Sequence, residues 1–272
     1  MQKIVFSDVD GTLLNSRHKL TPLTEQAIRT LKEQEIPFVI VSARSPSGIN
    51  SILKEYDFRC PIVSYSGAVI MDTDGQILYH KGMPVTEAAK VVSYIEDNHL
   101  PVTWNVFSYD QWITPDRSHP AVKLEESIVK TEAEEGTMAS LKGDEVHKIF
   151  CMCEPGTIWS VEEQLKKAFP QYSIAKSSDT LLEIMEAGVV KAEAVKILCN
   201  LWKVKVEDTV AFGDNYNDVE MLEAAGRGFL MANAPEELLK RIPEHTLSND
   251  EDGIYHALKK IKYIETVPLI SL

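Results

Sequence analysis

The sequence predicts an α/β protein: a doubly wound parallel-sheet core with a second, α+β domain inserted into the chain. In the first third, short apolar segments alternate with amphipathic helical patterns, which is typical of a parallel sheet covered on both faces. The same rhythm returns near Lys191. Between these parts the strand patterns are longer and paired, which suits an antiparallel sheet with helices on one face.

The elements of the first third follow from local signals. Thr21 is a candidate N-cap, and Pro22 is a favourable first helical residue. Asp72–Gly75 separates two short strand patterns and predicts a hairpin turn. Strands are expected at Lys3–Ser7, Pro37–Val41, Pro61–Tyr65, Val69–Met71 and Gln76–Tyr79, and helices at Thr21–Gln34 and Ser45–Asp57.

The rest of the chain divides in the same way. In the middle we expect helices at Val85–Asn98 and Thr157–Phe169, and strands at Val102–Phe107, Gln111–Thr114, His147–Cys153, Tyr172–Ala175 and Leu181–Met185. Pro115–Gly143 is acidic and weakly patterned. Later strands are expected at Thr209–Phe212 and Gly228–Met231, and helices at Lys191–Trp202, Asp218–Ala225, Pro235–Arg241 and Gly253–Lys262. We therefore expect a core from residues 1–82 and 187–272, with 83–186 as the inserted domain.

Charge and composition exclude several classes of function. The 272 residues include 28 Lys and Arg against 41 Asp and Glu, a formal net charge of −13. Such a surface repels a phosphate backbone, so we expect no nucleic-acid partner. No apolar run is long enough for a membrane span, and the N-terminus does not resemble a signal peptide, so we expect a cytoplasmic protein without a membrane partner. We expect a monomer or a weak homodimer.

Carboxylates follow two of the predicted parallel strands. Asp8 and Asp10 come after the first strand, and Asp214 and Asp218 come after Thr209–Phe212. Because ligands bind at the carboxyl ends of parallel strands, these four groups are expected at one edge of the sheet. Like charges so close would repel each other, and a bound Mg²⁺ would relieve that repulsion.

Mg²⁺ held by a few carboxylates often also holds a phosphate. Asp8, at the strand tip, could attack phosphorus and form an aspartyl-phosphate. Asp10 could protonate the leaving oxygen and then activate water. Ser42 offers a hydroxyl donor, and Lys191 a fixed positive charge, to the phosphoryl oxygens.

The order of these motifs resembles the haloacid dehalogenase superfamily of phosphatases. The resemblance rests on D-V-D-G-T-L-L from Asp8, Ser42 in V-S-A-R, Lys191, and G-D-N-Y-N-D from Gly213. Spacing, and the Met221-Leu222 that follows, resemble the Cof-type branch of sugar-phosphate phosphatases. The resemblance implies a Rossmann-like core and a type IIB cap domain that selects the leaving group.

The resemblance also implies roles for single residues. Asp8 is the expected nucleophile and Asp10 the general acid and base. Mg²⁺ would be held by the Asp8 side chain, the Asp10 main-chain carbonyl and Asp214, with Asp218 supporting them. The residues expected to bind phosphate or substrate are Ser42, Ala43, Arg44, Lys191 and Asn217.

Several positions depart from the family pattern. Ala43 and Asn215 stand where relatives usually have Gly, and Ala192 follows Lys191 where Gly is frequent. Ser66 replaces the usual Asn after the third strand and shortens a polar side chain. Each catalytic functional group is retained. Because these positions differ, the substrate preference of relatives cannot be carried over to this chain.

The expected substrate is a small phosphorylated metabolite, with sugar phosphates first and flavin or pyridoxal phosphates as alternatives. A phosphotransferase or mutase would use the same intermediate with a sugar hydroxyl as acceptor. A non-catalytic phospho-acceptor switch is a further alternative, against which the insert and Asp10 both speak. A dinucleotide-dependent oxidoreductase lacks its G-x-G-x-x-G signature here.

Overall fold

The computed structural model describes residues 3–265. By their contacts these residues form two compact units. The first unit contains the chain up to Ser42, Arg59–Gln76 and the chain from Val190 onward, and the second contains Ala43–Phe58 and Ile77–Val189.

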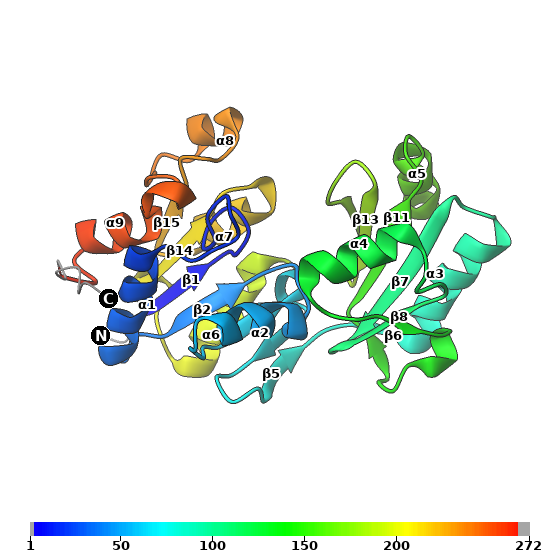
Figure 1. Cartoon of the computed structure of the whole chain (residues 1–272), viewed down its shortest axis with the longest axis horizontal. Coiled ribbons are helices and arrows are strands. Elements are labelled where there is room, and N and C mark those ends of the chain that lie inside the picture. The colour runs from blue at the N-terminus through cyan, green and yellow to red at the C-terminus, as the bar shows by residue number, and fades with distance from the viewer. Residues whose placement is uncertain (1–2, 266–272) are drawn as a thin grey trace. The chain divides into compact units, whose positions relative to one another are not determined.

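The first unit is built on six strands of a seven-stranded sheet, in the order β15-β14-β1-β2-β3-β4. Their bounds are β1 Ile4–Ser7, β2 Phe38–Val41, β3 Ile62–Ser64, β4 Val69–Met71, β14 Thr209–Gly213 and β15 Arg227–Leu230. Every pair from β15 to β3 is parallel, and β4 returns antiparallel to β3. Figure 1 shows β1 in blue between β14 and β2. The parallel sheet predicted from the apolar segments is therefore confirmed.

Helices cover both faces of this sheet. All residues of β1, β2 and β14 are buried, as strands covered on both sides should be. Helix α1 packs against α9, and α6 packs against α7. The crossovers from β1 to β2 and from β14 to β15 run in opposite directions, so right-handed connections place α1 and α7 on opposite faces. The helices are α1 Pro22–Glu33, α6 Lys191–Trp202, α7 Val219–Ala224, α8 Glu236–Arg241 and α9 Gly253–Lys260.

This topology fixes where a ligand can bind. From β1 the chain turns toward β2, whereas from β14 it turns toward β15. The carboxyl ends of β1 and β14 therefore flank the switch point of the sheet, where open α/β sheets bind their ligands. The register pairs Ser7 with Phe212, so the residues that follow both strands begin at the same level.

The second unit contains a six-stranded sheet in the order β12-β13-β11-β7-β8-β9. Its bounds are β7 Val102–Ser108, β8 Gln111–Thr114, β9 Glu134–Glu135, β11 Lys148–Cys153, β12 Ser173–Lys176 and β13 Leu181–Met185. The pairs are antiparallel except for β8 with β9. A separate short pair joins β6 Met83–Pro84 to β10 Glu145–Val146, and β5 spans Ile77–His80.

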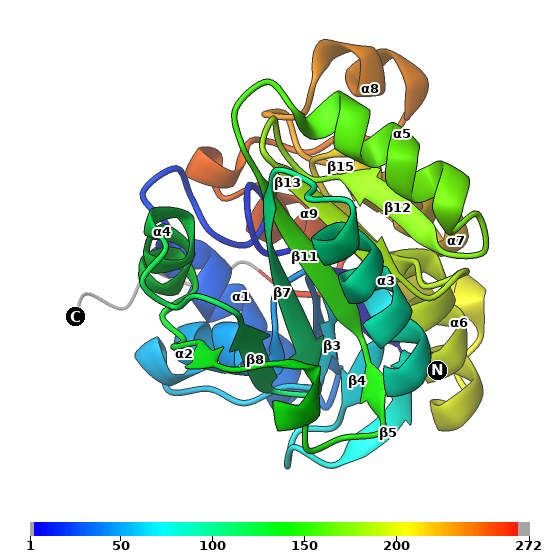
Figure 2. The same cartoon turned by 90° about the vertical axis from the view of Figure 1, so that its right-hand side faces the viewer.

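Two helices of the second unit share one face of this sheet. Figure 2 shows α3 Val85–Asp97 and α5 Ile158–Ala168 on the same side of this sheet, where α3 contacts β7 and α5 contacts β12 and β13. One buried cluster unites them, with Val91 from α3, Leu165 from α5 and Ile149 from β11 among its members. The predicted antiparallel sheet with helices on one face is confirmed. Helix α2 spans Pro46–Glu55.

Helix α4, Pro120–Val129, lies where the sequence offered no pattern. Val122 is its buried residue, whereas Leu124 and Ile128 are exposed, so its apolar side chains do not form one buried face. We assigned no element to Pro115–Gly143 from the sequence, so this helix was not predicted. No helix among residues 3–265 combines the length and apolarity that crossing a membrane requires.

Candidate active site

Asp8 lies at the carboxyl end of β1, beside the end of β14. Its backbone N–H donates to the carbonyl of Phe212 at 3.0 Å, which continues the parallel ladder by one residue. The residue is 7% exposed. The sheet therefore holds this carboxylate at the switch point with a small opening to solvent.

The chain turns tightly after Asp8. The carbonyl of Val9 accepts the N–H groups of Leu13 and Leu14, both at 3.0 Å. Gly11 has φ +83°, which favours glycine, and a Cβ there would lie 2.3 Å from Oδ2 of Asp214. Thr12 Oγ1 donates to Oδ1 of Asp214 at 2.7 Å. The D-G-T sequence thus brings the turn directly against the carboxylate that follows β14.

Asp218 holds the loop that carries Asp214. Its Oδ2 accepts the N–H groups of Asp214 and Asn215, both at 3.0 Å. The Asn215 side chain in turn caps the short helix Tyr216–Asp218. Asp218 is fully buried, so these bonds replace the water that its carboxylate lost on folding.

Lys191 is the first residue of α6 and is also buried. Its Nζ donates to Oδ1 of Asp8 at 2.5 Å and to Oδ1 of Asp218 at 2.6 Å. Although Lys191 is 183 residues from Asp8 in the chain, the structure makes it the link between the two aspartates.

We call Asp8, Asp214 and Asp218 the aspartate cluster. One carboxylate oxygen of each lies within 4.8 Å of the others. Burial raises the pKa of Asp8, and Lys191 opposes this shift. Burial also raises the pKa of Asp214 to about 6, against the hydrogen bond from Thr12. For Lys191, burial disfavours the ammonium, but the two carboxylates outweigh it and raise its pKa.

The donor set of the aspartate cluster fits a hard divalent cation. Lys191 offsets one of three converging carboxylates, so two negative charges remain in excess when all three are ionised. Burial is the main cause of the raised pKa values of Asp8 and Asp214, and the neighbouring carboxylates add to it. Oxygen ligands with this charge are what Mg²⁺ takes in proteins.

Ser42 follows β2 and is buried. Its N–H donates to the carbonyl of Val63, and its carbonyl accepts the N–H of Ser66, both at 2.9 Å. Tyr65 and Ser66 have positive φ values of 49° and 55°, conformations that cost energy outside glycine. The Ser66 loop, where the sequence departs from the family, is thus tied to the backbone of Ser42.

The remaining predicted residues do not join the aspartate cluster in the same way. Asp10 lies exposed in the turn and contributes to the raised pKa of Asp214. Asn217 is exposed in the short helix Tyr216–Asp218 that follows Asp214. Ala43 and Arg44 begin the second unit, where the carbonyl of Ala43 accepts a hydrogen bond from Lys148 Nζ at 3.1 Å.

The sequence analysis did not single out two residues that form polar contacts, Lys148 and Thr12. Lys148 lies on β11 and also forms an ion pair of 3.4 Å with Glu183. Its strand, K-I-F-C-M-C, has the pattern of a buried strand, so nothing local marked the lysine. Thr12 could have been found, because it belongs to the D-G-T motif itself.

A second group of ligand-type side chains lies in the second unit. We call His80, Glu145 and His147 the histidine cluster, whose ligand atoms also lie within 4.8 Å of one another. Glu145 Oε2 contacts His80 Nδ1 at 3.0 Å and accepts the Gly82 N–H at 2.9 Å. Burial lowers the pKa of His147 to about 4.

The proton of His147 opposes metal binding at the histidine cluster. The backbone N–H of Tyr109 donates to His147 Nδ1 at 3.0 Å. A neutral imidazole that accepts at Nδ1 carries its proton on Nε2, so Nε2 has no lone pair for a metal. Metal-binding histidines show the reverse arrangement and donate from the second nitrogen.

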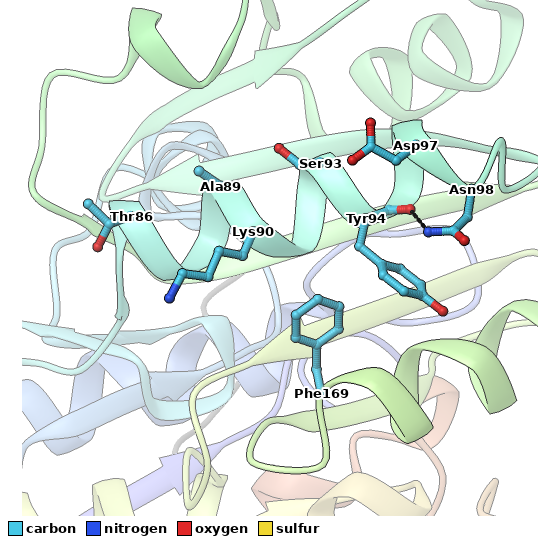
Figure 3. Close-up of a pocket in the computed structure, with 8 residues that line it drawn as sticks. All are labelled: Thr86, Ala89, Lys90, Ser93, Tyr94, Asp97, Asn98 and Phe169. Carbon is cyan, nitrogen blue, oxygen red and sulfur yellow. Dashed lines mark hydrogen bonds between the residues drawn. The ribbon is translucent and has the colours of Figure 1, made fainter.

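A hollow of about 420 Å³ runs along α3 (Figure 3). The rings of Tyr94 and Phe169 meet edge to face at one side of it, with centroids 5.4 Å apart. Lys90 in its wall pairs with Glu87 at 2.6 Å. These are groups of an ordinary helix surface and do not converge on one point in the hollow.

Comparison with known proteins decides the family. The sequence matches the haloacid dehalogenase-like hydrolases over residues 5–258. This chain belongs to that family. A Haemophilus influenzae protein named "Putative phosphatase" is 34% identical over 254 residues, covering 93% of this chain and 96% of its own. Phosphatase YwpJ of Bacillus subtilis is 26% identical, covering 95% and 99%.

A solved structure agrees with the sequence match. A haloacid dehalogenase-like hydrolase from Bacteroides thetaiotaomicron has a TM-score of 0.87 and 26% identity, covering 96% of this chain and all of its own. The resemblance derived from the motifs is therefore confirmed, together with the fold class. The expected enzyme class, a phosphatase of the haloacid dehalogenase family, is confirmed by the same relatives.

Proposed function

We propose that this enzyme is a Mg²⁺-dependent phosphomonoesterase that works through an aspartyl-phosphate at Asp8. One observation carries the proposal: a buried aspartate at the sheet switch point lies 2.5 Å from a buried lysine and within 4.8 Å of two further carboxylates. A nucleophile, a cationic partner and a set of oxygen ligands are thereby present in one place.

Asp8 would attack the phosphorus atom of the substrate through a carboxylate oxygen. A bond forms between that oxygen and phosphorus, and the bond from phosphorus to the leaving oxygen breaks. Asp10 would give its carboxyl proton to the leaving alkoxide. Because Asp10 lies exposed in the turn just after Asp8, it can exchange protons with solvent between turnovers.

Water would then attack the phosphorus of the aspartyl-phosphate. Asp10, now ionised, would accept the proton of that water, and the bond between phosphorus and Asp8 breaks to release phosphate. Lys191 would hold the Asp8 carboxylate in place and, with the Ser42 hydroxyl, stabilise charge on the phosphoryl oxygens. Asn217 and the Ala43-Arg44 segment would contact the substrate, as the family resemblance implies.

Mg²⁺ would be held by the Asp8 side chain, the Asp10 carbonyl and Asp214, with Asp218 supporting the loop. When bound, the ion neutralises the excess negative charge and polarises the phosphoryl oxygens. The backbone N–H groups of Asp214 and Asn215 donate to the Asp218 carboxylate. This supports separate roles for the two aspartates: Asp218 holds the loop, and the Asp214 carboxylate remains available to bind the ion.

We further propose that residues 83–186 form a type IIB cap domain between core segments 1–82 and 187–272, as in the Cof-type branch. The cap would select the leaving group, with sugar phosphates as the expected substrates. A monomer or weak homodimer in the cytoplasm remains the prediction from the sequence.

The test is phosphate release from a panel of phosphorylated metabolites with Mg²⁺ and with a chelator. We expect metal-dependent release, and borohydride added during turnover should convert residue 8 into homoserine, the reduction product of an acyl phosphate. Turnover without any reducible residue 8 would contradict the aspartyl-phosphate. If phosphate instead appears on an added sugar acceptor, the enzyme is a phosphotransferase with the same intermediate.

A further inference from the structure

Asn233 lies in the loop that follows β15, at the same edge of the sheet as Asp214. Strand β15 pairs with β14 in the register Leu230 with Gly213, so the residues after both strands leave the sheet side by side. A hydrogen bond of 3.0 Å from the Met231 N–H to the Gly213 carbonyl continues that pairing. The pairing of β15 with β14 thus places Asn233 at the same edge of the sheet as the aspartate cluster.

The Asn233 side chain joins two loops of the first unit. Its Nδ2 donates to the carbonyl of Gly11 at 2.8 Å, and its Oδ1 accepts the N–H of Asn249 at 3.1 Å. One neighbour can only accept and the other can only donate, so the chemistry fixes the orientation of the amide. Asn249 Nδ2 in turn donates to the Leu14 carbonyl at 2.8 Å.

Gly11 is the point through which this bond reaches the Asp214 carboxylate. Its Cα lies so close to Asp214 that a Cβ would overlap Oδ2 at 2.3 Å, and the next residue, Thr12, donates to Oδ1. A shift of the Gly11–Thr12 peptide must therefore either move the carboxylate or break the Thr12 bond. Asn233 holds the carbonyl of that same peptide.

We infer that Asn233 is a positioning residue for Mg²⁺ binding, which fixes the Gly11–Thr12 peptide and through it the Asp214 carboxylate. This inference rests on the proposed function. Asn233 acts through its neighbours and touches neither substrate nor the reacting atoms. Partners of this kind orient metal ligands, and their loss lowers metal affinity.

The experiment compares Asn233→Ala and Asn233→Leu with Asn249→Ala in the full chain. Asn249→Ala is the matched control, because it removes an amide from the same network but keeps the backbone N–H that Asn233 accepts. Mg²⁺ alone is titrated into each protein by calorimetry, without substrate. Thermal unfolding of the metal-free proteins is measured beside it.

We expect both Asn233 variants to bind Mg²⁺ about tenfold more weakly, and Asn249→Ala to stay within about twofold of the parent. Metal-free melting temperatures should remain close to the parent value, since Asn233 is exposed. At saturating Mg²⁺ the variants should recover most of kcat, while the Mg²⁺ concentration for half-maximal activity rises.

Parent-like Mg²⁺ affinity in the Asn233 variants would overturn the inference. Equal weakening in Asn249→Ala, or unfolding of both Asn233 variants, would also overturn it, because Asn233 would then serve loop stability in general. Failure of the parent enzyme to bind Mg²⁺ would contradict the proposed function itself and is read from the same titration.

Discussion

The aspartate cluster and the histidine cluster have similar spacing and different chemistry. In both, three ligand-type side chains bring one atom each within 4.8 Å. In the aspartate cluster three carboxylates meet one lysine, which leaves excess negative charge in a buried place. In the histidine cluster, Glu145 is engaged by His80 and Gly82, and the proton of His147 is placed on Nε2. Proximity of ligand atoms therefore does not define a metal site; charge and proton placement do.

The largest expected effect separates the two clusters by activity. Asp8→Asn removes the attacking carboxylate, so we expect phosphatase activity to fall by at least about 10³-fold. Glu145→Gln changes the histidine cluster by one charge and should leave turnover within about twofold, since surface changes away from a site have small effects. Steady-state assays on one substrate measure both. Activity retained by Asp8→Asn would break the comparison.

The second prediction concerns the close approach at Gly11. Gly11→Ala places a Cβ against Asp214 in a left-handed conformation, so we expect Mg²⁺ binding to weaken by about 10- to 100-fold. Gly75→Ala is the matched control, because Gly75 has φ +82° but open space around a Cβ. Both variants should lose about 1 kcal/mol or more of stability from backbone strain. If Gly75→Ala weakens Mg²⁺ binding as much, the contact with Asp214 is irrelevant.

The third prediction uses the acidity of the aspartate cluster. Mg²⁺ needs ionised carboxylates, and burial raises the pKa of Asp214 to about 6 and that of Asp8 as well. Mg²⁺ affinity should therefore fall as the pH drops toward and below 6, approaching about tenfold per pH unit for each proton displaced. Calorimetry between pH 5.5 and about 8 measures this, with Glu145→Gln as the variant expected to match the parent. Constant affinity over that range would contradict the cause assigned to the pKa shift.

How much of this could be predicted differs between the two units. Asp8 and Asp214 could be placed from the sequence, because each directly follows a short apolar strand and parallel strands end at one edge. Lys191 could be assigned through the family motif, but the two carboxylates it joins come from folding across 183 and 27 residues. Asn233 was not predicted from the sequence, because its proposed role depends on the register of β15 against β14.

Fewer features of the second unit could be predicted from the sequence. Helix α4 was not predicted, and its Leu124 and Ile128 are exposed rather than packed in the core. The histidine cluster joins His80 of β5, Glu145 of β10 and His147, which lies between β10 and β11, and has no motif spacing. Functional residues that directly follow parallel strands can be predicted from the sequence, because the sheet itself brings the ends of those strands together. Contacts that form only when antiparallel strands pack cannot be predicted in this way.

A further prediction concerns the histidine cluster and stability. Burial holds the pKa of His147 at about 4, below its ordinary value near 6.5, so the unfolded chain binds the extra proton more readily. Stability is then lost as the pH falls from about 6.5 toward 4, by about 1 kcal/mol per pH unit. His147→Asn keeps an acceptor for the Tyr109 N–H and should flatten that slope. Urea unfolding at several pH values tests this, and an unchanged slope would show that other groups cause it.

Mg²⁺ titration of three proteins tests the central claim most directly: the parent enzyme, Asp214→Asn and Glu145→Gln. The account predicts equal Mg²⁺ affinity for the parent and Glu145→Gln, and at least about tenfold weaker binding for Asp214→Asn. Weaker binding in Glu145→Gln together with parent-like binding in Asp214→Asn would assign the metal to the histidine cluster and contradict the account.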